Sequence, residues 1–282
     1  MIDAPTRAVD QTSATQARRG SSVGASNDAT TVARDLYIDL LIRSLVDGIY
    51  GEPMDGPWRP GNKFTRGPRV QGRLGPSTAH TMVGVDRLNN VRDLVQTALD
   101  DNIPGDFIET GVWRGGCCIL MRGILAANAV RDRKVYAADS FAGLPRPKPD
   151  AYPADRDNHL YEHTELEVSL EAVKANFARY GLLDDQVVFV EGLFSDTLPK
   201  LEAGPFALIR LDGDMYESTI LALQHLLPKV SPGGFVIIDD YGVQPECRQA
   251  VQDFRAQHRI EAPMHQIDRS GVWWRHASAP AH

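Results

Sequence analysis

The chain has 282 residues, of which 43% are hydrophobic, and its 30 basic and 37 acidic residues give a formal net charge of -7 at pH 7. This length suits one large α/β core with added segments. The acidic balance argues against a nucleic-acid-binding protein, because such surfaces are usually basic. No run approaches the roughly 20 apolar residues of a membrane-spanning helix, so no membrane association is expected.

The chain has three cysteines, Cys117, Cys118 and Cys247. The number is odd, and two adjacent cysteines are poorly placed to bridge each other. We therefore expect reduced thiols and a cytoplasmic protein.

The N-terminal third is predicted to lie outside the main sheet. Residues 1–30 lack apolar periodicity and are predicted to be a disordered tail. Apolar residues recur at helical spacing between Asp35 and Tyr50, with a start near Thr31 or Asp35, and again between Asp86 and Asp100. Residues 52–77, with five prolines, read as a long surface segment, either a lid or disordered. Residues 31–102 are therefore predicted to form an N-terminal helical cap with a lid segment.

From residue 103 to residue 282, short apolar strands alternate with helices. The predicted strands are Phe107–Glu109, Val135–Ala138, Val187–Val190, Phe206–Leu211 and Phe235–Ile238, and the predicted helices are Gly115–Asn128, Leu166–Tyr180, Tyr216–Leu227 and Glu246–His258. This alternation is typical of a doubly wound parallel sheet. A predicted hairpin of Met264–Ile267 and Val272–Arg275 adds an antiparallel member. The expected fold is α/β, with a Rossmann-like, seven-stranded, mostly parallel sheet.

Two pairs of aspartates follow predicted strands. Asp212 and Asp214 come after Phe206–Leu211, and Asp239 and Asp240 come after Phe235–Ile238. Ligands bind at the carboxyl ends of parallel strands. Four carboxylates at one edge repel each other unless a cation or a shared proton relieves them, and oxygen ligands suit Mg²⁺. Helix capping explains single aspartates, but it does not call for pairs on two strands.

A second predicted site follows the first strand of the sheet. The turn Gly111-Val112-Trp113-Arg114-Gly115 lacks the glycine spacing found in loops that bind a pyrophosphate. Taken alone, this turn is explained equally well by a structural role without a ligand. Asp139 ends the second strand, where a carboxylate can accept hydrogen bonds from ribose hydroxyls. Together the two features favour a nucleoside without a pyrophosphate, such as S-adenosylmethionine. Glu109 is then predicted to meet the methionine ammonium group of this cofactor, and the helix N-terminus beyond Gly111 its carboxylate.

Several strings of residues between Asp35 and Arg275 follow a family pattern in order and spacing. They are Ala79-His80-Thr81-Met82-Val83-Gly84, Glu109-Thr110-Gly111-Val112-Trp113-Arg114-Gly115-Gly116, Ala138-Asp139-Ser140-Phe141, Tyr180-Gly181-Leu182-Leu183-Asp184-Asp185, Leu211-Asp212-Gly213-Asp214-Met215-Tyr216, Ser231-Pro232-Gly233-Gly234-Phe235 and Asp239-Asp240-Tyr241. The chain resembles the macrocin O-methyltransferase family. The resemblance implies a class I methyltransferase that uses S-adenosylmethionine and Mg²⁺ to methylate a deoxysugar hydroxyl of an antibiotic, such as a macrolide or an aminocoumarin.

The resemblance also implies roles for particular residues. Asp212, Asp239 and Asp240 would bind the metal, and Asp214 would act as the general base. The implied cofactor contacts are Thr81, Met82, Glu109, Thr110, Gly111, Asp139, Ser140, Gly192, Leu193, Phe194 and Asp212.

Two other readings stay open at this point. A catechol-type methyltransferase would share the fold, the cofactor and the metal, but its acceptor pocket would be flat and walled by aromatic side chains. A non-catalytic binding protein would not need all four aspartates. We also expect a homodimer or higher homo-oligomer, because the first predicted helix has an apolar face that the sheet need not cover.

Overall fold

The computed structural model describes residues 22–49 and 78–276, with side chains from residue 29 onward. The predicted lid, residues 52–77, lies outside the described residues, as do residues 1–21 of the predicted tail. None of the described helices is long and apolar enough to cross a membrane.

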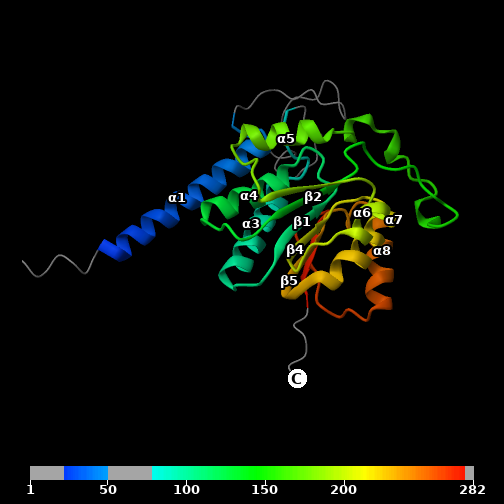
Figure 1. The fold of residues 1–282 in the computed structure, drawn as a ribbon. Coiled ribbons are helices and arrows are strands. Elements are labelled where there is room, and N and C mark those ends of the chain that lie inside the picture. The colour runs from blue at the N-terminus through cyan, green and yellow to red at the C-terminus, as the bar shows by residue number, and fades with distance from the viewer. Residues whose placement is uncertain (1–21, 50–77, 277–282) are drawn as a thin grey trace, which may run out of the picture.

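A seven-stranded sheet in the order β3-β2-β1-β4-β5-β7-β6 forms the centre of the molecule (Figure 1). Its strands are β1 (Asp106–Thr110), β2 (Val135–Asp139), β3 (Val187–Glu191), β4 (Phe206–Leu211), β5 (Val230–Ile238), β6 (His265–Gln266) and β7 (Val272–Arg275). The first five strands pair in parallel, and β7 runs antiparallel to both β5 and β6. The predicted sheet and its C-terminal hairpin are confirmed.

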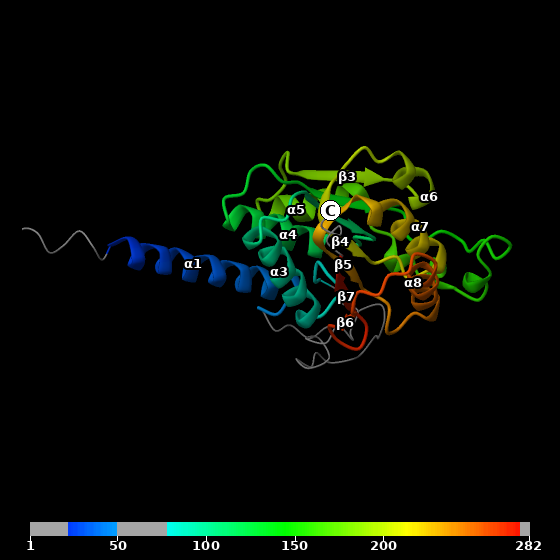
Figure 2. The ribbon, with the colours of Figure 1, turned by 90° about the horizontal axis from the view of Figure 1, so that it is seen from below.

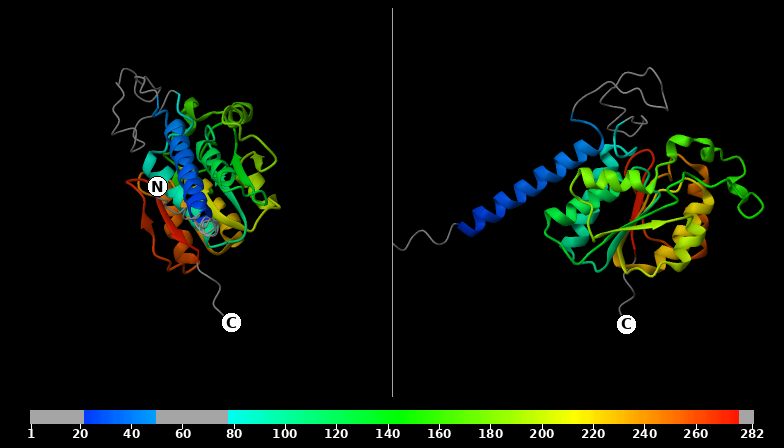
Figure 3. Two further views of the ribbon diagram at one scale, coloured as in Figure 1. Left: turned by 90° about the vertical axis from the view of Figure 1, so that its left-hand side faces the viewer. Right: turned by 45° about the horizontal axis from the view of Figure 1, so that its top comes forward.

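Helices cover both faces of the sheet (Figure 3). The helices are α1 (Ser22–Leu45), α3 (Val85–Asp100), α4 (Gly116–Ala127), α5 (Leu170–Arg179), α6 (Phe194–Thr197), α7 (Tyr216–Leu226) and α8 (Pro245–Gln257). One hydrophobic cluster joins α1, α3, α4 and α5 to one face of the sheet, and a second joins α7 and α8 to the other. The predicted helix from Leu166 begins instead at Leu170, because the Ser169 hydroxyl caps it by accepting a hydrogen bond from the Ala172 amide.

The first helix, α1, is longer than predicted. It begins at Ser22, so residues 22–30 of the predicted tail are helical. Its C-terminal half packs into the core through Ile38, Leu41, Ile42 and Leu45, whereas its N-terminal half extends away from the body (Figure 2). Packing of the second half thus supports a helix whose first residues carry no apolar pattern of their own.

The close approach of β1 to β4 brings the two predicted sites together. Gly111 follows β1 with φ +81°, and a Cβ atom there would lie 1.6 Å from the carbonyl oxygen of Asp212. The Asp212 amide also donates to the Thr110 carbonyl oxygen at 2.9 Å. Only glycine fits this position, and its absence of a side chain lets the first aspartate lie beside the glycine turn.

The segment between β2 and α5 supports the start of α7. The buried Asp155 carboxylate accepts hydrogen bonds from the amides of Tyr216 at 2.7 Å and of Glu217 at 2.9 Å. These amides have no partner within their own helix, since they belong to its first turn. Asp155 therefore fixes α7 directly after Asp214.

Replacing Asp155 by Ala removes both of these hydrogen bonds. We expect the free energy of unfolding to fall by about 1–2 kcal/mol, the usual effect of losing a helix cap. Urea unfolding measures this change, with Asp157→Ala at an exposed position of the same segment as the control. Equal midpoints for the two variants would contradict a capping role for Asp155.

Candidate active site

Three carboxylates converge at the carboxyl ends of β4 and β5. One oxygen atom from each of Asp212, Asp214 and Asp240 lies within 4.8 Å of the others. Asp240 is 7% exposed, and its Oδ2 accepts a hydrogen bond from the Asp214 amide at 3.3 Å. Oxygen atoms at such spacing are a donor set that fits a hard divalent cation.

Local backbone geometry places Asp214. Its φ of 57° lies in the left-handed region, which aspartate tolerates better than most residues. The tight turn that results is closed by the Met215 amide, which donates to the Gly213 carbonyl oxygen at 2.5 Å. Gln244, just before α8, donates from its side-chain amide to Asp214 Oδ1 at 3.2 Å. Asp214 is therefore held beside Asp212 rather than projecting into solvent.

The three carboxylates hold protons more tightly than free aspartates. Burial, followed by the charge of Asp212, raises the pKa of Asp214 to about 7. Burial, followed by the charge of Asp214, raises the pKa of Asp240 well above its ordinary value, and burial with the nearby Asp239 raises the pKa of Asp212. Each shift records the cost of placing negative charges close together away from water.

Because these pKa values are raised, a cation entering the cluster must displace protons. Lowering the pH from 8 to 6 takes Asp214 through its pKa from mostly ionised to mostly protonated, so Mg²⁺ affinity should fall by on the order of tenfold per displaced proton. Calorimetric titration with Mg²⁺ at the two pH values measures this. An affinity that stays constant or rises at pH 6 would contradict binding at these carboxylates.

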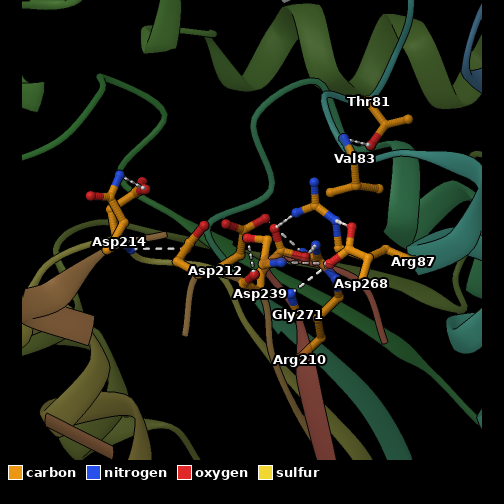
Figure 4. A network of polar contacts seen from close by, with 12 residues as sticks. Thr81, Val83, Arg87, Arg210, Asp212, Asp214, Asp239, Asp268 and Gly271 are labelled. Atoms are coloured by element: carbon orange, nitrogen blue, oxygen red, sulfur yellow. Dashed lines mark hydrogen bonds and ion pairs between the residues drawn. The ribbon is translucent and has the colours of Figure 1, made fainter. Parts of the chain in front are cut away.

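Asp239 points toward a different set of partners (Figure 4). Its Oδ1 accepts from the Arg210 guanidinium and its Oδ2 from that of Arg87. Arg87 also pairs with Asp268 at 3.2 Å. The structure thus brings Asp214, rather than Asp239, together with Asp212 and Asp240. Each oxygen of Asp239 retains a second lone pair, so its predicted role as a metal ligand stays a prediction.

Arg210, in β4, joins this network to β1. The side chain is 1% exposed, and its Nη1 donates to Glu109 Oε1 at 2.5 Å and to Asp212 Oδ2 at 2.7 Å. Glu109 Oε2 also accepts from the Cys118 thiol at 2.9 Å. Burial raises the pKa of Glu109 to about 7, although Arg210 opposes the shift. The arginine therefore holds carboxylates from three adjacent strand ends in one buried array.

A cavity runs along the strand ends beside the carboxylate cluster. Eight of the predicted cofactor contacts line it: Met82, Gly111, Asp139, Ser140, Gly192, Leu193, Phe194 and Asp212. The predicted base Asp214 lines it too. The residues that sequence reasoning missed are Trp113, Gly143, Leu144, Pro145, Lys148, Leu166, Ser195, Gly213, Glu217, Ser218 and Leu221. Most of them come from the insertion after β2 and from α7. No motif or periodicity within either segment predicts that the two segments line the same cavity.

The remaining three predicted contacts are Thr81, Glu109 and Thr110. Thr81 accepts from the Val83 amide at 3.2 Å, Thr110 is buried at the end of β1, and Glu109 is engaged by Arg210 and Cys118. The cavity lining includes none of the three. Their contacts with a cofactor, including the predicted pairing of Glu109 with an ammonium group, stay predictions.

Asp139, at the end of β2, links the two loops that border the cavity. Its Oδ2 accepts from the Val112 amide at 2.7 Å and its Oδ1 from the Phe141 amide at 2.9 Å. Its side chain also lines the cavity, at the position predicted to face a ribose. The carboxylate thus has a structural role that the sequence did not reveal.

Comparison with known protein families shows to which family the chain belongs. The family model described as macrocin-O-methyltransferase matches residues 58–276. The chain belongs to this family. As a member of the macrocin O-methyltransferase family it is an O-methyltransferase, and the resemblance read from the motifs is confirmed.

Two curated relatives match the chain over nearly their whole length. The chain is 51% identical over 253 residues to 8-demethyl-8-(2,3-dimethoxy-alpha-L-rhamnosyl)-tetracenomycin-C 4'-O-methyltransferase of Streptomyces olivaceus, covering 89% of this chain and 97% of the relative. It is 47% identical over 242 residues to demethyldecarbamoylnovobiocin O-methyltransferase of Streptomyces niveus, covering 85% and 92%.

A solved structure supports the fold assignment. The O-methyltransferase NovP is similar with a TM-score of 0.83 and 46% identity, covering 86% of this chain and 99% of that one. The fold is therefore the class I methyltransferase fold predicted from the sequence, a Rossmann-like sheet with an added N-terminal helix.

Proposed function

We propose that the chain is an S-adenosylmethionine- and Mg²⁺-dependent enzyme that methylates a deoxysugar hydroxyl of a glycosylated natural product. The observation that carries the proposal is the shared position of two sites: Asp212 and Asp214 belong to the carboxylate cluster and also line the cavity that contains Asp139. The names of the relatives add the acceptor class, since one acts on a rhamnosyl-tetracenomycin and another on a demethylated novobiocin.

The residues present fit both bound groups. The cluster of Asp212, Asp214 and Asp240 offers oxygen donors whose mutual repulsion a cation relieves. The cavity offers the acidic side chain of Asp139 and the glycine turn at Gly111 for a nucleoside. When bound, S-adenosylmethionine supplies the methyl group and Mg²⁺ makes a sugar hydroxyl more acidic.

Asp214 is our candidate for the base that removes the hydroxyl proton. Burial and the charge of Asp212 raise its pKa to about 7 when no cation is bound, and a cation held by Asp212 and Asp240 would lower this pKa, so that Asp214 would be ionised and able to accept a proton at neutral pH. The hydrogen bond from Gln244 holds one carboxylate oxygen, and the second oxygen is available for the proton. The left-handed turn fixes this carboxylate at the border of the cavity, where an acceptor hydroxyl would approach.

Replacing Asp214 by Asn removes the base while keeping a side chain of the same shape. We expect kcat to fall by about 10²–10⁴-fold, the usual contribution of a general base. Gln244→Ala provides a milder comparison, because it frees the carboxylate without removing it. Steady-state kinetics measures both variants, and a loss below tenfold for Asp214→Asn would assign the proton transfer to another group.

The acceptor class is tested by mass spectrometry after incubation with S-adenosylmethionine and Mg²⁺. The panel contains glycosylated aminocoumarins, macrolides and tetracenomycins, together with their aglycones and simple catechols. A gain of one methyl group on glycosides, with no gain on aglycones, is the expected result. Methylation of catechols alone would overturn the proposal in favour of an aromatic diol as acceptor.

The proposed enzyme is also a homo-oligomer. Val32, Leu36 and Leu40 lie along α1 with 52%, 65% and 55% of their surfaces exposed, an apolar strip that a second copy would cover. Light scattering after size-exclusion chromatography measures the mass in solution, and a monomer at micromolar concentration would contradict this part of the proposal.

A further inference from the structure

One buried carboxylate that lines the cavity, that of Glu217, has no part in the proposed methyl transfer. Glu217, in the first turn of α7, is 4% exposed and lines the cavity. Its Oε1 accepts a hydrogen bond from Lys148 Nζ at 2.7 Å. Its Oε2 has less than 1 Å² of exposed surface and no hydrogen-bond partner among the described residues. A buried carboxylate oxygen without a partner is costly, so a donor that completes it is expected in the working protein.

Lys148, which also lines the cavity, is the partner of Glu217. It belongs to the insertion after β2, 69 residues away in sequence, and half of its side chain is exposed. The hydrogen bond to Glu217 raises the pKa of Lys148, so the ammonium group stays charged at neutral pH. An ammonium group has three donor hydrogens, and Glu217 accepts only one of them. The pair therefore presents one acceptor atom and further donors side by side.

Many of the other side chains that line the same cavity are apolar. They include Leu144 and Pro145 from the insertion, Leu193 and Phe194 after β3, and Leu221 of α7. Leu221 stands four residues after Glu217, so the two side chains share one face of the helix. Such an environment suits a flat heteroaromatic ring whose faces contact apolar side chains and whose edge meets the polar pair.

We propose that Glu217 and Lys148 recognise the adenine edge of the bound cofactor, an inference that rests on the proposed use of S-adenosylmethionine. Glu217 Oε2 accepts from the exocyclic amino group, and Lys148 donates to the neighbouring ring nitrogen. Adenine combines an amino donor with an adjacent acceptor nitrogen, which is the complement of what the pair offers. A hypoxanthine ring reverses both groups, because it carries a carbonyl oxygen and a ring N–H. The pair thus selects adenine and rejects its deaminated form.

The test compares the binding of S-adenosylhomocysteine and S-inosylhomocysteine by isothermal titration calorimetry, without acceptor. The wild-type protein should bind the adenine compound on the order of 10²-fold more tightly, because a buried charged acceptor would otherwise face a carbonyl oxygen. Glu217→Gln should reduce this preference at least tenfold, since a carboxamide can donate to the carbonyl oxygen as well as accept. Glu171→Gln, at an exposed site on α5, is the matched control and should keep the wild-type preference.

Lys148→Ala is the second variant, chosen because half of the lysine side chain is exposed, so the variant should fold. It should also reduce the preference for adenine, by several-fold. An unchanged preference in Lys148→Ala and in folded Glu217→Gln would overturn the proposal. Failure of the wild-type protein to bind S-adenosylhomocysteine would instead overturn the proposed function, and calorimetry separates the two outcomes.

Discussion

Replacing Asp212 by Asn should lower methyl transfer on the order of 10³-fold or more, while the affinity for S-adenosylhomocysteine changes less than tenfold. Asp212 is the member of the carboxylate cluster that both lines the cavity and accepts a hydrogen bond from Arg210. Asparagine keeps an oxygen for the Arg210 hydrogen bond but removes the charge that holds a divalent ion. Loss of a metal that stabilises a developing alkoxide costs several kcal/mol in the barrier.

Kinetics with excess Mg²⁺ and calorimetry with S-adenosylhomocysteine measure the two parts of this prediction. Asp132→Asn, at an exposed position between α4 and β2, is the control for loss of one negative charge. Activity of Asp212→Asn within tenfold of the control would contradict a metal held by this carboxylate.

Replacing Arg210 by Met should lower the free energy of unfolding by about 3–5 kcal/mol. The guanidinium is 1% exposed and pairs with Glu109, Asp212 and Asp239, so methionine would leave Glu109 and Asp212 without this cation and Asp239 with Arg87 alone. Removing one partner from a buried ionic array costs far more than a surface pair, because the remaining charges stay away from water. Methionine fills a similar volume, so the loss reports on charge rather than on a void.

Urea unfolding monitored by tryptophan fluorescence measures the change, with Arg131→Met at an exposed site as the control. The effect should be smaller at pH 5 than at pH 8, because burial raises the pKa of Glu109 to about 7 and protonation then removes part of the uncompensated charge. Equal stability of the two variants at pH 8 would contradict the role of Arg210 as the cation of the array.

The strands and their aspartates were predictable because buried parallel strands read as short apolar runs with clear ends. Phe206–Leu211 matches β4 in full, and Asp212 and Asp240 lie where the strand ends placed them. Asp239 and Asp240 both follow the end of β5, but Asp239 pairs with Arg87 and Arg210, whereas Asp240 joins Asp212 and Asp214. The sequence shows the two aspartates, but it does not show the arginines that pair with Asp239.

Other features depend on contacts between distant segments. Arg87 lies 152 residues from Asp239, and Lys148 lies 69 residues from Glu217, so periodicity carries no sign of either pairing. The α6 helix spans only Phe194–Thr197, too short for a helical repeat to show. The start of α1 at Ser22 was missed because that end of the helix has no apolar pattern.

Metal dependence of the enzyme is measured most directly as methyl transfer to a glycoside acceptor by the same preparation in EDTA and after restoring Mg²⁺ in excess. We expect a loss of activity in EDTA on the order of 10²-fold or more, with full recovery on Mg²⁺ addition and no recovery for Asp212→Asn. Equal rates in EDTA and in Mg²⁺ would contradict a catalytic cation at the carboxylate cluster.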